Sequence, residues 1–207
     1  NIINFIYPSI PENGKLITGS RRIETTLHNN LSYNSLYVIT KNKEIESIYD
    51  KVKLVPFGEF MPFGDFIDLN NFSNINGFRP GEKRNIIHSE NLPPFVPAIC
   101  YEIIFSGYLY DKNMQPDWIL NITNDAWFGN SSGPYQHFAS SRMRAIEHGL
   151  PLVRVANSGI TAVVDGYGRI LNKIDLNEEG IINSAIPTKL SKTLFTEFGH
   201  SLFLFIS

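Results

Sequence analysis

The single cysteine of this chain, Cys100, is the residue whose setting best suits chemistry. It ends a short apolar run that begins at Phe95, and Tyr101 and Glu102 follow it directly. Such a run predicts a strand that carries the thiol to the edge of a sheet. A thiol acts as a nucleophile in its thiolate form, which needs a nearby cation or base. We therefore predict that Cys100 is the nucleophile of an acyl-transfer site, with an inert core cysteine as the simpler alternative.

Two regions of the chain offer the positive charge that a thiolate needs. Lys51 and Lys53 stand before residues 54–64, where two prolines and two glycines among aromatic residues predict a rigid, packed loop. His137 lies near the start of a predicted helix, but none of the five histidines stands in a local pattern with the cysteine. A surface or core position is therefore the simpler interpretation of His137.

Composition and spacing argue against a metal, a cofactor and a nucleic-acid partner. The 207 residues carry a net charge of −2 with acids and bases interspersed, so there is no basic stripe to bind phosphates. One cysteine cannot form an internal disulfide, and no His-x-x-x-His, Cys-x-x-Cys or EF-hand spacing occurs. The polar residues Asn121, Thr123, Asn124 and Asp125 resemble a cation site, but capping and turn hydrogen bonds explain such runs more often.

The pattern of elements predicts one α/β domain with a mixed sheet. Residues 135–148 form a predicted helix that starts after a Gly-Pro pair and ends at Gly149. The turn after residue 164 predicts a hairpin, which makes the sheet mixed. Asn29, Asn30 and Ser32 indicate a turn. The expected strands are residues 15–18, 36–40, 95–100, 118–122, 152–156 and 160–164; residues 41–50 form a hairpin arm or loop, 66–90 a surface segment and 103–110 the start of a helix.

The two ends of the chain suggest a fragment. No methionine or signal peptide is visible at Asn1, and residues 202–206 form an apolar run far short of the ~20 residues that span a bilayer. The run is either a buried terminal element or the first turns of a truncated membrane helix. We expect a domain over residues 1–193, incomplete at its N-terminus, and a truncated apolar segment over residues 194–207.

A series of motifs, in order, covers nearly the whole chain. They are Tyr49-Asp50-Lys51, Leu54-Val55-Pro56-Phe57-Gly58-Glu59, Ile99-Cys100-Tyr101-Glu102, Asn124-Asp125-Ala126-Trp127-Phe128-Gly129, Gly133-Pro134-Tyr135-Gln136-His137-Phe138, Arg142-Met143-Arg144-Ala145 and Asn157-Ser158-Gly159-Ile160-Thr161-Ala162-Val163. Together they resemble the bacterial apolipoprotein N-acyltransferases, a membrane-bound branch of the carbon-nitrogen hydrolase, or nitrilase, superfamily. Each motif alone is weak, but the combination is specific.

The resemblance implies an α-β-β-α sandwich and a Glu-Lys-Cys triad without a cofactor. Cys100 would take an acyl chain from a phospholipid as a thioester and pass it to the amine of a lipid-modified apolipoprotein. Lys51 would favour the thiolate and stabilise the tetrahedral oxyanion. Glu59 would orient the lysine or assist proton transfer, and Tyr101 and Glu102 match residues that the family needs beside its nucleophile. The resemblance places the site at the bacterial inner membrane, facing the periplasm.

One part of the family pattern has no counterpart in this sequence. The triad glutamate of the family, its general base, lies farther upstream of the lysine than Asn1, and Pro11-Glu12 is a poor match because no apolar strand leads into it. Without a base, turnover should fall by roughly 10² to 10⁴ unless a partner chain supplies the carboxylate. Sheet edges left uncovered would also favour aggregation or a partner.

Two other functions remain open at this stage. A soluble nitrilase-type amidase would pack residues 57–66 inward, whereas a lipid-handling enzyme would expose those aromatic side chains. A non-catalytic remnant would at most bind lipid or a partner.

Overall fold

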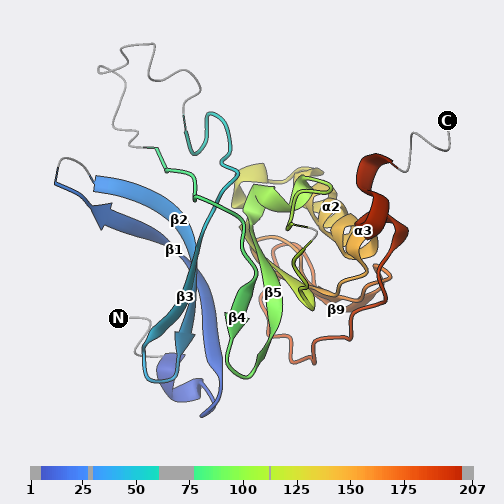
Figure 1. Cartoon of the computed structure of the whole chain (residues 1–207), viewed down its shortest axis with the longest axis horizontal. Helices are drawn as coiled ribbons and strands as arrows, with labels where there is room; N and C mark the ends of the chain where they lie inside the picture. Colours follow the sequence, from blue (N-terminus) through green and yellow to red (C-terminus); the bar gives the residue numbers. More distant parts are fainter. Residues whose placement is uncertain (1–5, 28–29, 61–76, 112, 202–207) are drawn as a thin grey trace. The chain divides into compact units, whose positions relative to one another are not determined.

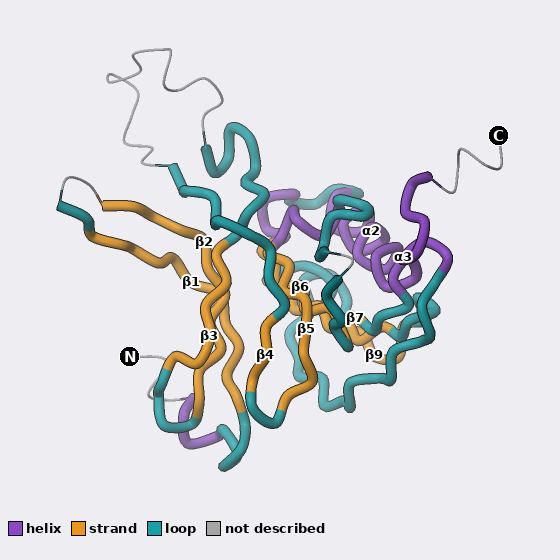
Figure 2. Tube along the Cα trace, in the orientation of Figure 1, coloured by secondary structure: helices purple, strands orange, loops and turns teal. Residues whose placement is uncertain are grey.

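A computed structural model describes residues 6–27, 30–60, 77–111 and 113–201 of the chain. It divides into two compact units, residues 1–84 and residues 85–207, and each unit has a sheet of its own. Figure 1 follows the chain through both units, and Figure 2 separates strands from helices and loops.

The first unit is built on an antiparallel sheet of three strands, β1 (Lys15–Thr25), β2 (Asn30–Thr40) and β3 (Ile45–Asp50), in the order β1-β2-β3 (Figure 1). A short 3-10 helix, η1 (Tyr7–Ser9), precedes them. The central strand β2 buries Leu36 and Val38 completely, as expected for alternate residues on one face of a pleated strand. A small cluster of Tyr7, Ile10 and Ile39 completes the core of this unit.

The strands predicted in this unit are present but longer than expected. Residues 41–50, left open between a hairpin arm and a loop, include β3, which pairs with β2. The turn predicted at Asn30 and Ser32 is wrong, because both residues lie within β2; Asn29 lies outside the described residues. Ser32 is buried and its hydroxyl accepts hydrogen bonds from Arg21, so a partner on β1 outweighs the turn preference of serine.

The second unit has a mixed six-stranded sheet, as the hairpin signal predicted, in the order β4-β5-β6-β7-β8-β9. The central strands β5, β6 and β7 are parallel, and β4, β8 and β9 pair antiparallel with their neighbours. The strands are β4 (Ile87–Ser89), β5 (Leu92–Ile99), β6 (Trp118–Asn124), β7 (Leu152–Asn157), β8 (Thr161–Val164) and β9 (Ile170–Ile174). Parallel strands end on the same edge, so the ends of β5, β6 and β7 lie together.

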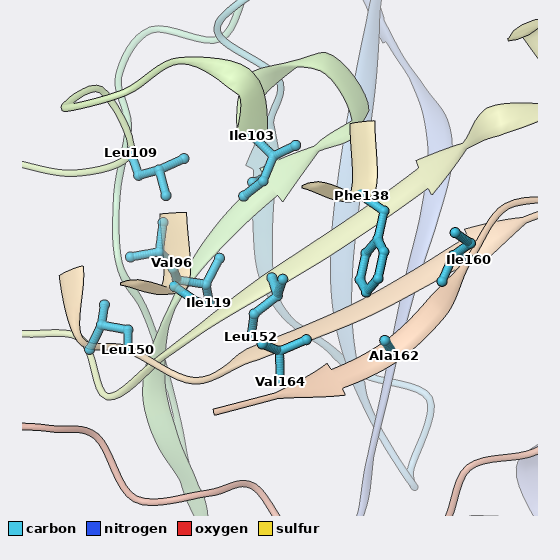
Figure 3. Packing of buried hydrophobic residues seen from close by; sticks show 12 residues of the cluster. Val96, Ile103, Leu109, Ile119, Phe138, Leu150, Leu152, Ile160, Ala162 and Val164 are labelled. Atoms are coloured by element: carbon cyan, nitrogen blue, oxygen red, sulfur yellow. The ribbon is translucent and has the colours of Figure 1, made fainter. Parts of the chain in front are cut away.

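The predicted helix is α2 (Gly133–His148), and it packs against this sheet. Pro134 lies in its first turn, and Gly149 ends it in the left-handed conformation with φ 63°. Phe138 of α2 lies among aliphatic side chains of the strands, as Figure 3 shows. The core of this unit is Val96, Ala98, Ile103, Leu109, Ile119, Phe138, Ala145, Leu150, Leu152, Ile160, Ala162 and Val164.

Two predictions of local structure in this unit are wrong. Residues 103–110 do not start a long helix: the 3-10 helix η2 (Cys100–Ile104) ends at once, and the chain turns through Gly107 with φ 66°. Ile103 and Leu109 are both buried in the core, so tertiary packing fixes a turn there. Of the predicted surface segment 66–90, residues 66–76 lie outside the described residues, and the rest is not all surface, since β4 pairs with β5 and Ile87 is buried.

The aromatic and C-terminal segments are described only in part. Phe57 is exposed, while residues 61–66 of the predicted aromatic loop lie outside the described residues, as does the apolar run 202–206. Before that run the chain forms α3 (Leu194–Phe198). Among the residues described, no helix is long and apolar enough to cross a membrane.

Candidate active site

The predicted nucleophile stands at the end of a central strand. Cys100 follows Ile99, the last residue of β5, and opens the 3-10 helix η2. Its φ of 51° lies in the left-handed region, which costs a non-glycine residue about 1–2 kcal/mol and persists only where neighbouring contacts hold it. The residue is partly exposed, and it stands at the C-terminal end of a central strand of the sheet.

The side chain of Glu102 restrains the turn at Cys100. Its side chain is buried, and its carboxylate accepts a hydrogen bond from the backbone N–H of Ile99 at 2.9 Å. A charge-assisted bond between residues on either side of Cys100 restrains the backbone around it. Tyr101 points its ring edge-on to Phe105, with centroids 4.9 Å apart. The sequence prediction for Tyr101 and Glu102 concerned their roles in the reaction, and those roles stay a prediction.

Lys51, the predicted cation, is buried in the first unit and paired with a carboxylate. Lys51 directly follows β3, and its side chain is 1% exposed. Its ammonium lies 2.6 Å from Oε2 of Glu59, and the same carboxylate accepts hydrogen bonds from Val55 N–H at 2.8 Å and from the Asn34 amide at 2.9 Å. A buried ammonium is stable only beside a counterion, so Glu59 fixes the position of the Lys51 side chain.

A series of buried, hydrogen-bonded polar side chains lies next to Cys100 in the second unit. Oδ1 of Asp125 lies 2.9 Å from Nδ1 of His137, and Oδ2 accepts a hydrogen bond from Arg154 at 2.6 Å. Nε2 of His137 in turn lies 3.2 Å from the backbone oxygen of Cys100. Burial alone would raise the pKa of Asp125, but hydrogen bonding from His137 and the charge of Arg154 outweigh it and hold that pKa below its ordinary value.

Several hydrogen-bond acceptors surround the guanidinium of Arg154, which explains how this charged side chain tolerates complete burial. Its guanidinium donates to Oδ1 of Asn121, to the hydroxyl of Ser141 at 3.1 Å and to the backbone oxygen of Ile160 at 3.2 Å, besides Asp125. The amide of Asn121 then donates to the backbone oxygen of Ala98 in β5 at 2.9 Å. The network therefore ties β5, β6, α2 and β7 together beneath the nucleophile.

Some of these residues were candidates from the sequence alone, but their contacts with one another were not predicted. The capping interpretation is confirmed for Asn124, whose side chain accepts from Ala126 N–H. His137 is a buried histidine, one of the two positions expected for it. Neither Asp125 nor Arg154 was expected to contact His137, because the three side chains come from separate elements. Within the described ranges, no group of three or more His, Cys, Asp or Glu side chains could hold a metal.

Glu12, the weak match to the general base, is exposed and forms an ion pair with Lys41. That Lys51 and Glu59 act together with Cys100 stays a prediction.

Comparison with known proteins identifies the family. The sequence pattern of the carbon-nitrogen hydrolases matches residues 11–193. The chain belongs to the carbon-nitrogen hydrolase family. A solved carbon-nitrogen hydrolase from Helicobacter pylori has the same fold, with a TM-score of 0.60 at 17% identity over 81% of this chain and 60% of that one. A nitrilase-superfamily protein from Saccharomyces cerevisiae aligns with a TM-score of 0.59 at 18% identity, over 86% of this chain and 62% of that one. The predicted α/β fold of the carbon-nitrogen hydrolase type is thus confirmed.

Within the carbon-nitrogen hydrolases, the curated relatives similar to this chain are apolipoprotein N-acyltransferases. The one from Rhodopseudomonas palustris is 44% identical over 172 residues, which are 81% of this chain and 32% of that protein. The one from Rickettsia bellii is 48% identical over 176 residues, or 84% of this chain and 35% of that protein. The resemblance inferred from the motifs is confirmed, and the chain spans about a third of the length of these relatives.

Proposed function

We propose that this chain carries the nucleophile and the lysine of an apolipoprotein N-acyltransferase. The reaction moves a fatty acyl chain from a phospholipid to the N-terminal amine of a lipid-modified apolipoprotein through a thioester on Cys100. The observation that carries the proposal is the left-handed turn of the partly exposed Cys100 at the end of β5, in a chain 44% identical to an enzyme of that name. A strained turn at a nucleophile is a recurrent feature of acyl-transfer sites.

The acyl chain moves in two displacements. The Cys100 thiolate attacks the ester carbonyl of the phospholipid, the S–C bond forms, the C–O bond breaks, and the leaving oxygen takes up the proton that the thiol gave up, which releases a lysophospholipid. The apolipoprotein amine then attacks the thioester and loses a proton, an amide forms, and the thiolate leaves and takes up that proton to regenerate the thiol. Each step passes through a tetrahedral oxyanion, which a fixed positive charge stabilises.

Lys51 is the group proposed to supply that charge. Its ammonium is already ordered by Glu59 and buried from water, so it needs no reorganisation during the reaction. Glu59 acts as the residue that positions Lys51. Glu102 restrains the backbone beside the thiol through Ile99, and Tyr101 is proposed to line the acyl site next to it.

The proposed partners are a phospholipid donor and an apolipoprotein acceptor at the bacterial inner membrane, with the site facing the periplasm. A soluble amidase is the competing function within the family. The aromatic residues favour the lipid substrate: Phe57 is 76% exposed and Trp127 is 87% exposed. Large apolar side chains in water suit a surface that meets lipid.

The proposal is tested by mass spectrometry of the chain after incubation with phospholipid vesicles. Because the chain has one cysteine, an added acyl mass that hydroxylamine removes identifies a thioester on Cys100. Cys100→Ala is the control and should gain nothing. The incubation is repeated after adding the segment that precedes the matched region in a relative, as a source of the family's base. A thioester in either reaction supports the proposal, and its absence in both favours a non-catalytic remnant.

A further inference from the structure

Cys100 holds a backbone conformation that needs support from outside its own turn. Its φ of 51° is unfavourable for any residue with a Cβ, and a 3-10 helix of five residues has little cohesion of its own. Glu102 restrains the N-terminal side of the turn by accepting from Ile99 N–H. The other restraint acts on the carbonyl group of Cys100 itself.

That restraint is the ring of His137. The oxygen of Cys100 can only accept a hydrogen bond, and Nε2 of His137 lies 3.2 Å from it, within reach of donating one. The contact links α2 to the residue that follows β5. A backbone carbonyl held in this way restrains the plane of the Cys100–Tyr101 peptide, and so limits rotation about the Cα–C bond of Cys100.

His137 is itself held on its other side. Its Nδ1 lies 2.9 Å from Oδ1 of Asp125 and 3.3 Å from Nη2 of Arg154. Thr123 donates to the same Asp125 oxygen at 3.0 Å, and the ring of Phe128 packs 5.7 Å from the imidazole, centroid to centroid. Four groups on β6, η3 and β7 therefore leave the imidazole one orientation, with Nε2 toward Cys100.

We propose that His137 is a positioning residue for the nucleophile, and that Asp125, paired with Arg154, holds its imidazole so that Nε2 aligns the Cys100 peptide for acyl attack. The inference rests on the proposed function for the identity of the nucleophile and extends it to residues that do not contact the substrate. A misalignment of the reacting sulfur slows acyl transfer far more than it slows reaction with a small, undemanding electrophile.

Two probes of the same thiol separate alignment from exposure. p-Nitrophenyl acetate transfers an acetyl group to Cys100: the S–C bond forms, p-nitrophenolate leaves, and the thiol proton passes to solvent. Its burst in a single turnover reports how well the sulfur is aligned, without a phospholipid or a general base for the leaving group. Iodoacetamide alkylates the same sulfur and reports its accessibility. The chain has one cysteine, so both signals belong to Cys100.

His137→Leu and His137→Gln are the paired variants. Leucine keeps the bulk without the donor, and we expect the burst rate to fall about tenfold while alkylation changes less than about twofold. The amide of glutamine can donate to the Cys100 oxygen, so we expect the burst rate of His137→Gln within about threefold of the unchanged protein. Equal rates for the two variants, or equal losses in both assays, would overturn the positioning role.

Asp125→Asn and Asp165→Asn form a second pair of variants. Both aspartates are buried and paired with an arginine at 2.6 Å, but Asp165 pairs with the largely exposed Arg169 in the β8–β9 turn, whereas Arg154 is completely buried. We expect Asp125→Asn to slow the burst about fivefold, and Asp165→Asn to leave it within about twofold although it also lowers the melting temperature. Equal slowing by both would show a general loss of stability and refute the inference.

The positioning role and the proposed function can fail separately. A burst that depends on His137, with no thioester from phospholipid vesicles, would refute the acyl donor and leave the positioning role standing. A thioester from phospholipid that forms as fast in His137→Leu as in the unchanged protein would refute the positioning role and leave the acyl donor standing. If the unchanged protein is alkylated but gives no burst, the turn does not align the sulfur, and the inference is wrong.

Discussion

Replacing Glu59 with glutamine should destabilise the first unit, because it leaves the ammonium of Lys51 buried without its counterion. The Lys51 side chain is 1% exposed and Glu59 is 14% exposed, so the pair is largely shielded from water. Removing one partner of a buried pair costs about 3–5 kcal/mol. Glutamine keeps an oxygen for Lys51 and Val55, and the partial exposure of Glu59 softens the loss, so we expect about 2–3 kcal/mol.

The matched control is Glu24→Gln in the same unit. Glu24 pairs with Arg22 at 3.0 Å on the surface, and Arg22 also pairs with Asp50 at 2.7 Å, so the arginine stays neutralised. An exposed pair of this kind contributes at most about 1 kcal/mol. Urea unfolding followed by circular dichroism compares the two variants. A slope of about 2 kcal/mol per molar urea places the midpoint of Glu59→Gln roughly 1 M lower than that of the unchanged protein.

Equal, small shifts for Glu59→Gln and Glu24→Gln would refute this reasoning. They would mean that the Lys51 ammonium is hydrated, or that another group neutralises it, and Glu59 would then lose its proposed role in holding the lysine for catalysis.

The remaining predictions concern pH and one helix terminus. Since the pKa of Asp125 is lowered in the folded state, its stabilising effect is complete above the ordinary pKa of 3.8 and disappears as the pH falls below that value; the melting temperatures of Asp125→Asn and the unchanged protein should therefore converge in acid. Burial, and secondarily the charge of Arg144, lower the pKa of His148 from 6.5 to about 4, so the unfolded chain gains a proton first and stability falls as the pH drops from 6.5 to about 4. Thermal melts of His148→Phe across that range should lack this loss, which we put at about 2–4 kcal/mol. Gly149→Ala should lower the free energy of unfolding by about 1–2 kcal/mol, measured in urea, because φ is 63° and a Cβ would lie 3.0 Å from Cγ2 of Thr193.

Local chemistry explains why much of the fold was predictable. The helix over residues 133–148 has proline at its start and glycine after its end, and both signals act within a few residues. The apolar runs that became β5 and β6 are buried over Phe95–Ile99 and Trp118–Leu120, and short continuous apolar runs of this kind predict buried strands. Where local signals conflicted with tertiary contacts, as at Ser32 and at residues 103–110, the contacts decided the structure.

The amino-acid sequence by itself determined the family of this protein and the positions of most of its strands, and it singled out Cys100 as the predicted nucleophile. Motif order and the lone cysteine are properties of the chain that need no coordinates. Only the tertiary structure decided that Cys100 adopts a left-handed turn and that His137, Asp125 and Arg154 meet behind it. Those three side chains come from α2, η3 and β7, and no sequence spacing encodes their contact. It arises because parallel strands end at one edge of a sheet and a packed helix covers that edge.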